Sequence, residues 1–267
     1  YLKEARSSID AHYNINFDGR ALVGDDPENI NDQDYGNKDV VGPNEEGAKH
    51  GTHVSGIIAA RRGNNQGNRG VFDGAKIMVL RAVPDGDEYD KDIALAIRYA
   101  VDNGAKVINT SFGKGYSPHQ EWVLDALKYA EKNDVLIVNA AGNSGANIDP
   151  GKKKTYITDE FEGKEVVSNF LTVGAVCPSY DEEQVASFSN FGSINVDVFA
   201  PGTEIWSSVP NGKYEYYSGT SMAAPNATGV AAVLLSFFPK LKPWQVKKTL
   251  MNSGVPLYPT IKSPDSD

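Results

Sequence analysis

Short apolar runs alternate along this chain with segments whose apolar residues recur at helical spacing. Five runs have the length and composition of buried strands: residues 76–82, 105–110, 134–140, 169–176 and 195–200. A strand that is apolar along its whole length is typical of a parallel sheet covered on both faces. Strands and helices in alternation therefore predict an α/β fold, in which a doubly wound, mostly parallel sheet lies between two layers of helices.

Two helices are predicted between the first three of these strands. In the first, over residues 90–103, the apolar face consists of Ile93, Ala94, Ile97, Ala100 and Val101. Gly104 ends this helix. The second helix is expected to begin with Ser117 as its N-cap and Pro118 at its first helical position. These start and stop signals support the alternating pattern.

The ends of the chain differ in composition from its centre. Residues 1–50 contain 11 acidic and 5 basic residues and account for 6 of the 9 excess negative charges. Residues 24–39 are rich in turn formers and poor in aliphatic residues, so they are predicted to form a loop. Residues 1–267 are interpreted as one domain, with an acidic, loop-rich segment over 1–45 and a polar tail or linker over 255–267. The first and last residues look like cut ends, which suggests a fragment or a processed form.

Charge and composition narrow the classes of function. The 26 basic and 35 acidic residues give a net charge of −9, which argues against a broad nucleic-acid-binding surface. No apolar run approaches the roughly 20 residues of a spanning helix. The single cysteine, Cys177, cannot form an internal disulfide, and it excludes a cysteine-rich zinc site.

Three segments place one polar side chain among small residues. They are residues 49–60 with His50, residues 138–145 with Asn143, and residues 218–225 with Ser221. Taken singly, each has a structural explanation as a helix cap or a turn. Taken together, an imidazole, a hydroxyl and a side-chain amide are the components of an acyl-transfer site. In doubly wound sheets such groups meet beyond the carboxyl ends of the strands.

Five blocks, in this order, resemble the signature motifs of the subtilase (subtilisin-like) serine peptidases. They are His50-Gly51-Thr52-His53-Val54-x-Gly56, Asn109-Thr110-Ser111-Phe112-Gly113, Ala140-Ala141-Gly142-Asn143, Ala200-Pro201-Gly202 and Gly219-Thr220-Ser221-Met222-Ala223-x-Pro225. Each block alone is moderately specific, and five in order are strong evidence. The α/β pattern, obtained separately, agrees with that family's fold.

The resemblance implies a serine endopeptidase that acts through an acyl-enzyme. Ser221 would be the nucleophile and His50 the base that takes its proton. The Asn143 amide would donate to the developing oxyanion, beside a backbone N–H at a helix N-terminus. The second histidine, His53, is interpreted as structural.

The resemblance also implies where a polypeptide substrate binds. Ser111, Phe112 and Gly113 would pair with an extended substrate and form a wall of the pocket for the side chain before the cleaved bond. Ala141 and Gly142 would lie across the same groove, with Gly142 leaving room for a substrate carbonyl. Residues 146–167 are expected to form a surface insertion beside Asn143.

Two other site chemistries fit the sequence poorly. An α/β-hydrolase elbow requires Gly-x-Ser-x-Gly, but Ala223 stands at the last position, and His50 precedes Ser221 instead of following it. A zinc site at His50 and His53 lacks a third ligand in any recognisable motif. Neither alternative is favoured over the peptidase.

The third member of the triad has no clear match. The family pattern is an Asp at the end of an apolar strand followed by Ser/Thr-Gly, and neither Asp18 nor Asp10 has that context. The expectation is that the triad Asp lies upstream of Tyr1. Without it the chain alone would be weak or inactive, since loss of this Asp costs about 10⁴-fold in rate. The alternative function is a pseudoprotease or peptide-binding module.

The remaining expectations concern ions, partners and location. No cofactor is required and no metal site is assigned. The acidic segment 25–39 could bind a structural Ca²⁺ through Asp32, Asp34, Asn37 and Asp39, although its spacing favours a solvated turn. A propeptide or an inhibitor is a further partner compatible with the family. Export to the periplasm, cell surface or medium is expected, and no signal segment is visible.

Overall fold

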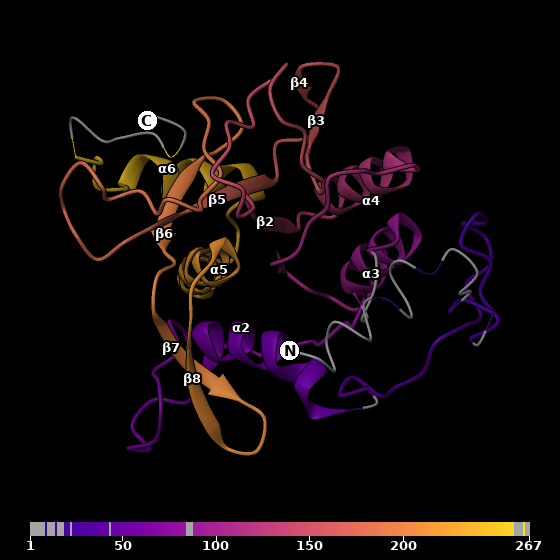
Figure 1. The fold of residues 1–267 in the computed structure, drawn as a ribbon, viewed down its shortest axis with the longest axis horizontal. Coiled ribbons are helices and arrows are strands. Elements are labelled where there is room, and N and C mark those ends of the chain that lie inside the picture. The colour runs from indigo at the N-terminus through magenta and orange to yellow at the C-terminus, as the bar shows by residue number, and fades with distance from the viewer. Residues whose placement is uncertain are drawn as a thin grey trace.

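A computed structural model describes residues 9, 14, 19–21, 23–42, 44–83, 88–258 and 264. Helices and strands alternate as predicted from α3 to β2, whereas the strands from β2 to β8 follow one another with no helix between them (Figure 1). The helices are η1 Glu45–Ala48, α2 Lys49–Ala59, α3 Asp90–Asp102, α4 Gln120–Lys132, α5 Thr220–Phe237 and α6 Pro243–Ser253. The strands are β1 Val107–Thr110, β2 Leu136–Ala140, β3 Glu160–Phe161, β4 Lys164–Glu165, β5 Phe170–Val176, β6 Val198–Pro201, β7 Ile205–Val209 and β8 Lys213–Tyr217.

The central sheet is parallel and has the order β1-β2-β5-β6. In β2 the side chain of Ile137 packs against α3 and α4, whereas Leu136 and Val138 pack on the opposite face against α5 and α6. Successive residues of a strand point to opposite faces, so a strand buried on both faces is apolar throughout. The three layers confirm the predicted α/β fold (Figure 1).

The prediction of a strand over residues 76–82 is wrong. These residues form no strand, and Ile77, Met78 and Val79 are 42%, 42% and 50% exposed. Within the described chain the ladder order makes β1 an edge of the sheet, and no strand pairs with residues 76–82. An apolar run gains strand structure only where a neighbouring strand takes up its N–H and C=O groups.

Helix α4 begins later than predicted. Its N-cap is His119 instead of Ser117, and Pro118 precedes the helix. The cause is Asp90, whose carboxylate accepts the Ser117 hydroxyl at 2.7 Å and the His119 N–H at 2.9 Å. Asp90 therefore takes the hydroxyl that the sequence pattern assigned to a cap.

The predicted loop from 24 to 39 contains no helix or strand. Two of its carboxylates, Asp25 and Asp32, lie beside cationic side chains. The fully buried ammonium of Lys91 pairs with Asp25 and lies 3.5 Å from Asp32, while Arg20 pairs with Asp25 at 3.1 Å. No group of three or more His, Cys, Asp or Glu side chains in the described ranges is arranged to hold a metal. The calcium hypothesis stays a prediction.

Candidate active site

The hydroxyl of Ser221 lies in the first turn of α5, between β1 and the loop that follows β2. Ser221 is half-buried, and its Oγ donates to the backbone carbonyl of Ser111 at 3.0 Å. The Ser111 hydroxyl donates in return to the Ser221 carbonyl at 2.9 Å. The parallel register of β1 and β2 brings Ser111 and the loop after β2 to the same edge of the sheet, and the two hydrogen bonds join α5 to Ser111 there.

Asn143 lies against the same helix N-terminus. Its Oδ1 accepts the backbone N–H and the hydroxyl of Thr220, each at 2.8 Å. These two donors fix the amide so that Nδ2 is the free donor, and within the described residues Nδ2 makes no hydrogen bond. The Ser221 N–H is likewise unpaired there, because it lies in the first turn of α5. One backbone donor, the Ser221 N–H, and one side-chain donor, Nδ2 of Asn143, are thus available beside the Ser221 hydroxyl.

Thr220 is a functional residue that sequence reasoning did not single out. Besides holding Asn143, its hydroxyl accepts the Gly142 N–H at 3.0 Å, and the side chain is buried. Its place next to Ser221 in the Gly219-Thr220-Ser221 block is the sequence feature that could have identified it. Gly142 itself has φ +100°, and a Cβ there would lie 2.5 Å from Nδ2 of Asn190. The close contact with Asn190 is therefore what requires glycine in this structure.

His50 lies in the first turn of α2, and α2 packs against α5. Val54, one turn further along α2, shares an apolar cluster with Met222, the neighbour of Ser221. His50 is exposed by its accessible surface, and its side chain makes no hydrogen bond or ion pair within the described residues. The protein atoms around the imidazole still desolvate it and lower the pKa of His50 below its ordinary 6.5, with His53 as a smaller cause.

His53 is fully buried and belongs to the scaffold. Its Nε2 lies 3.0 Å from the Glu215 carbonyl, and its ring stacks on Tyr217 with 4.4 Å between centroids. Since Nε2 must donate to that carbonyl, Nδ1 carries no proton in the neutral ring. Burial lowers the pKa of His53, which agrees with a neutral, structural histidine.

The two predicted sides of the substrate groove differ in whether their backbone N–H and C=O groups are already hydrogen-bonded. Ala141 is buried, its N–H donates to Val173, and its carbonyl accepts Nδ2 of Asn190. Gly142 is paired at both groups as well. In contrast, the described residues leave the N–H and C=O of Phe112 and Gly113 unpaired. Strand pairing with a peptide is open along 111–113, and closed along 141–142.

Comparisons with known proteins agree with this arrangement. The model of the subtilase family (peptidase S8) matches residues 11–263. This chain is a subtilase. Asp18 and Asp10, the in-chain candidates for the triad carboxylate, lie outside the described residues.

Two curated relatives and one solved structure illustrate the similarity. A thermophilic serine proteinase of Bacillus sp. (strain AK1) is 39% identical over 82% of this chain and 48% of its own length. The cell wall-associated protease of Bacillus subtilis (strain 168) is 43% identical over 77% of this chain and 21% of its own. The crystal structure of fervidolysin from Fervidobacterium pennivorans has a TM-score of 0.65 and 37% identity over 78% of this chain and 33% of that one. This subtilase spans less than half the length of these proteins.

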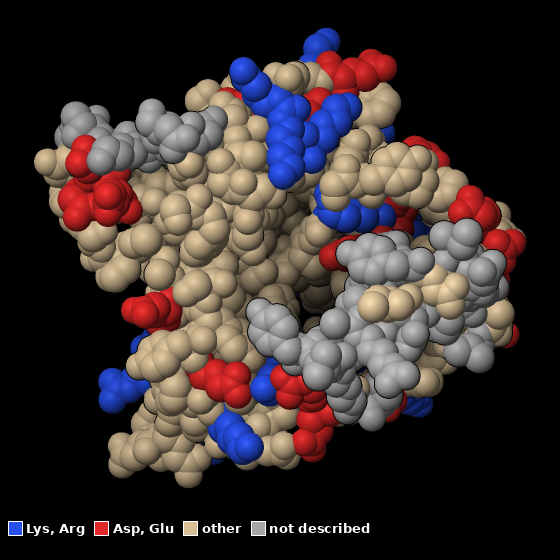
Figure 2. Space-filling view, viewed as in Figure 1, with Lys and Arg blue, Asp and Glu red and all other residues tan. Residues whose placement is uncertain are grey.

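Figure 2 shows a hollow near the centre of the face turned to the viewer, with uncharged residues along its left border. None of the described helices is long and apolar enough to cross a membrane.

Residues 146–167 are more than the surface insertion expected of them. Ile148, Ile157 and Val167 are buried, and the backbone of Tyr156 pairs with Lys114 through hydrogen bonds of 2.6 and 2.8 Å. Because Lys114 follows Gly113, this pairing joins the segment to the predicted substrate edge. The segment therefore lies beside the edge that is predicted to pair with a substrate.

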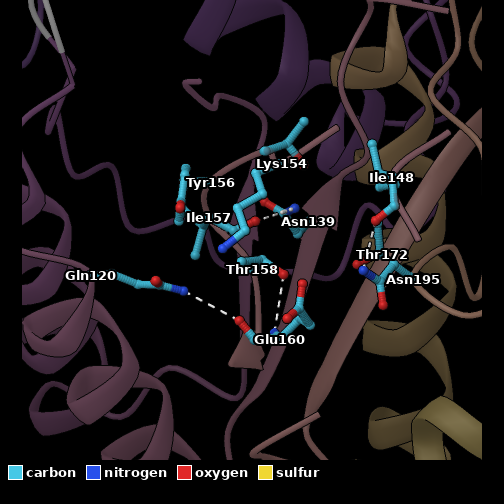
Figure 3. Close-up of a pocket in the computed structure, with 11 residues that line it drawn as sticks. Gln120, Asn139, Ile148, Lys154, Tyr156, Ile157, Thr158, Glu160, Thr172 and Asn195 are labelled. Atoms are coloured by element: carbon cyan, nitrogen blue, oxygen red, sulfur yellow. Dashed lines mark hydrogen bonds between the residues drawn. The ribbon is translucent and has the colours of Figure 1, made fainter. Parts of the chain in front are cut away.

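Behind this pairing lies a small polar pocket, partly open to solvent (Figure 3). Asn139 enters it from β2 and donates to the Ile157 carbonyl at 3.3 Å, while Gln120 donates to the Glu160 carbonyl at 3.2 Å. The side chain of Thr158 accepts the Glu160 N–H at 3.1 Å. These bonds hold residues 157–160 in place against α4 and the sheet.

Next to this pocket, Asp159 has a buried carboxyl group whose Oδ2 has no hydrogen-bond partner among the described atoms. Burial raises the pKa of Asp159 to about 7, against the opposing effect of Lys247. Lys247 itself lies 2.8 Å from Asp197 and 3.4 Å from Glu165. Lys247 thus pairs with two other carboxylates, and its charge offsets only part of the effect of burial on the pKa of Asp159.

We expect Asp159→Asn to stabilise this subtilase in alkaline solution. A folded-state pKa raised from 3.8 to about 7 makes the contribution of Asp159 to stability fall as the pH rises through that window, by up to about 4 kcal/mol. Denaturant unfolding at about pH 4 and about pH 8 measures this effect. The variant should match the original chain at the lower pH and exceed it at the higher one. Parallel stability curves would show that Asp159 does not titrate in this range.

Proposed function

We propose that this chain is the peptidase domain of a serine endopeptidase that hydrolyses peptide bonds through an acyl-enzyme. The observation that carries the proposal is the grouping at the N-terminus of α5 of the Ser221 hydroxyl, the unpaired Ser221 N–H and the Asn143 amide. Because the chain spans only part of its relatives, the activity of the whole protein is part of the proposal.

The chemistry follows from these groups. His50 takes the proton from Ser221 Oγ as the oxygen attacks the substrate carbonyl carbon. The carbonyl oxygen becomes an oxyanion, which accepts hydrogen bonds from Nδ2 of Asn143 and the Ser221 N–H. His50 then gives its proton to the leaving amine, and an acyl-enzyme remains on Ser221. Water, deprotonated by His50, releases the acid and restores the hydroxyl.

Substrate binding acts on the same contacts. An extended peptide that adds to residues 111–113 brings an N–H to the Ser111 carbonyl, which here accepts the Ser221 hydroxyl. Once that carbonyl is occupied by substrate, the hydroxyl is free to turn toward His50. Substrate binding is thus proposed to free the Ser221 hydroxyl from the Ser111 carbonyl before it attacks that substrate.

We further propose that a carboxylate outside the described residues completes the triad at His50. The described residues lower the pKa of His50, whereas a carboxylate at its Nδ1 would raise it. Neither Asp18 nor Asp10 has the sequence context of the family motif, so neither is the preferred source. Substitutions Asp18→Asn and Asp10→Asn in the intact protein are then expected to change the rate of labelling by a fluorophosphonate less than about twofold.

The pH dependence of that labelling tests the carboxylate. With the carboxylate in place, the rate should rise with pH around a pKa above 6.5, the ordinary value for histidine. A midpoint below 6.5 would mean that His50 acts without a carboxylate. A loss of about 10⁴-fold in Asp18→Asn or Asp10→Asn would instead place the carboxylate at that residue.

Other parts of the proposal concern partners and location. Export is proposed because a relative is named for its association with the cell wall. A propeptide or inhibitor would bind along the same 111–113 edge as the substrate.

A structural calcium ion would bind through carboxylates other than Asp25 and Asp32, because these two lie beside the ammonium of Lys91. The pseudoprotease alternative would be favoured only by an intact, folded protein that resists labelling.

A further inference from the structure

A row of polar side chains joins β1 to α5 beneath Ser221. Thr228 donates its hydroxyl to Oδ1 of Asn109, Nδ2 of Asn109 donates to Oγ of Ser111, and Ser111 donates to the Ser221 carbonyl, each at 2.9 Å. Ser111 and Thr228 are 6% and 4% exposed. The Ser221 carbonyl can only accept, so Ser111 donates to it and accepts from Nδ2 of Asn109, which leaves Oδ1 to accept the Thr228 hydroxyl.

The Ser221 carbonyl needs a donor from outside the helix. In an α-helix the carbonyl of residue 221 accepts the N–H of residue 225, but residue 225 is Pro225, which has no N–H. A buried carbonyl without a donor costs free energy. The Ser111 hydroxyl supplies the missing hydrogen bond at the residue that carries the nucleophile.

Asn109 decides where the Ser111 hydroxyl points. A serine hydroxyl has one proton, and its oxygen can accept while it donates. Because Nδ2 of Asn109 occupies the oxygen of Ser111 as acceptor, the single proton is directed to the Ser221 carbonyl. Thr228, two turns beyond Ser221 on α5, donates to Oδ1 of Asn109 in this orientation and anchors the amide.

We propose that Asn109 is a positioning residue for the nucleophile. It orients the Ser111 hydroxyl, which holds the Ser221 peptide unit at the point where Pro225 interrupts the helical hydrogen bonds. This inference rests on the proposed function, in which Ser221 is the nucleophile. Asn109 does not touch the substrate or the reacting atoms; it acts through Ser111.

The test uses the intact protein with Asn109→Ala, Ser111→Ala and the double variant. Each single substitution should lower kcat and the fluorophosphonate labelling rate by about tenfold to 10²-fold, because small misplacements of a nucleophile have effects of that size. KM for a peptide substrate should stay nearly unchanged. The double variant should be no slower than Ser111→Ala, because Asn109 acts only through that hydroxyl. Ser111→Thr, which keeps the hydroxyl, should recover most of the rate.

Controls separate positioning from folding. Asn103→Ala removes an exposed asparagine whose amide binds the Tyr99 carbonyl at the end of α3, and it should label at the original rate. Circular dichroism and thermal unfolding identify the folded fraction, to which all rates are referred. Asn109→Asp gives a second, nearly isosteric variant; its carboxylate accepts the Ser111 proton and should slow labelling as Ser111→Ala does.

The outcomes are distinct. Folded Asn109 variants that label at the original rate would overturn the inference and leave the proposed function intact. Single effects that multiply in the double variant would also overturn it, since Asn109 would then act independently of Ser111. An intact, folded original protein that does not label would contradict the proposed function, and the positioning role with it.

Discussion

Replacing Ser221 by alanine is expected to lower kcat on a peptide substrate by about 10⁶-fold and to abolish fluorophosphonate labelling. The reason is that Ser221 supplies the only bond that holds the acyl group between the two halves of the reaction. Removing the nucleophile of a serine-peptidase triad has an effect of that size, and the residual rate comes from the oxyanion donors and binding. Labelling followed by peptide mass spectrometry measures both the rate and the labelled residue.

Two further variants control this prediction. His50→Ala should lose a similar factor, and Ser221→Ala combined with His50→Ala should be no worse than either alone, because the two side chains act as a unit. Ser236→Ala removes the hydroxyl near the other end of α5, where it binds the Val233 carbonyl, and it should label normally. Label on any residue other than Ser221 would refute the assignment of the nucleophile.

The second large effect is expected at Asn143. Asn143→Leu removes the Nδ2 donor, which is expected to cost about 10²- to 10³-fold in kcat while KM changes little. A loss in kcat without a change in KM is the informative result, because an oxyanion exists in the transition state and not in the bound substrate. Steady-state kinetics on one peptide substrate give both parameters.

Asn143→Asp separates the donor from the rest of the side chain. The carboxylate can still accept the Thr220 N–H and hydroxyl, which Asn143 accepts at 2.8 Å, but it has no donor for the oxyanion. It should therefore remain folded and be at least as slow as Asn143→Leu. Ser144→Ala, on the same exposed loop, serves as the control with unchanged kinetics. A large rise in KM with unchanged kcat would show that Asn143 binds substrate instead.

The sequence predicts most of what is local in this structure. The apolar strands β1, β2 and β5 and the helix α3 lie where their patterns place them, because periodicity follows directly from burial on one or two faces. The motif blocks predict the grouping of Ser221, Asn143 and Ser111 because parallel strands bring their carboxyl ends to one edge.

The errors arise where a distant residue decides the local structure. Asp90 takes the Ser117 hydroxyl and moves the start of α4, which no pattern near residue 117 encodes. Residues 76–82 have the composition of a strand, but a strand forms only when a neighbour pairs with it. In the same way, the contact between the Ser111 hydroxyl and the carbonyl left open by Pro225 joins residues 110 positions apart.

A structure of the intact protein bound to a peptide aldehyde tests the central claim most directly. We predict a covalent bond from Ser221 Oγ to the former aldehyde carbon. The former aldehyde oxygen should lie within hydrogen-bond distance of Nδ2 of Asn143 and of the Ser221 N–H, and His50 should lie beside Oγ. The peptide should pair with residues 111–113. An adduct oxygen that turns away from Asn143, or a His50 ring out of reach of the new bond, would contradict it.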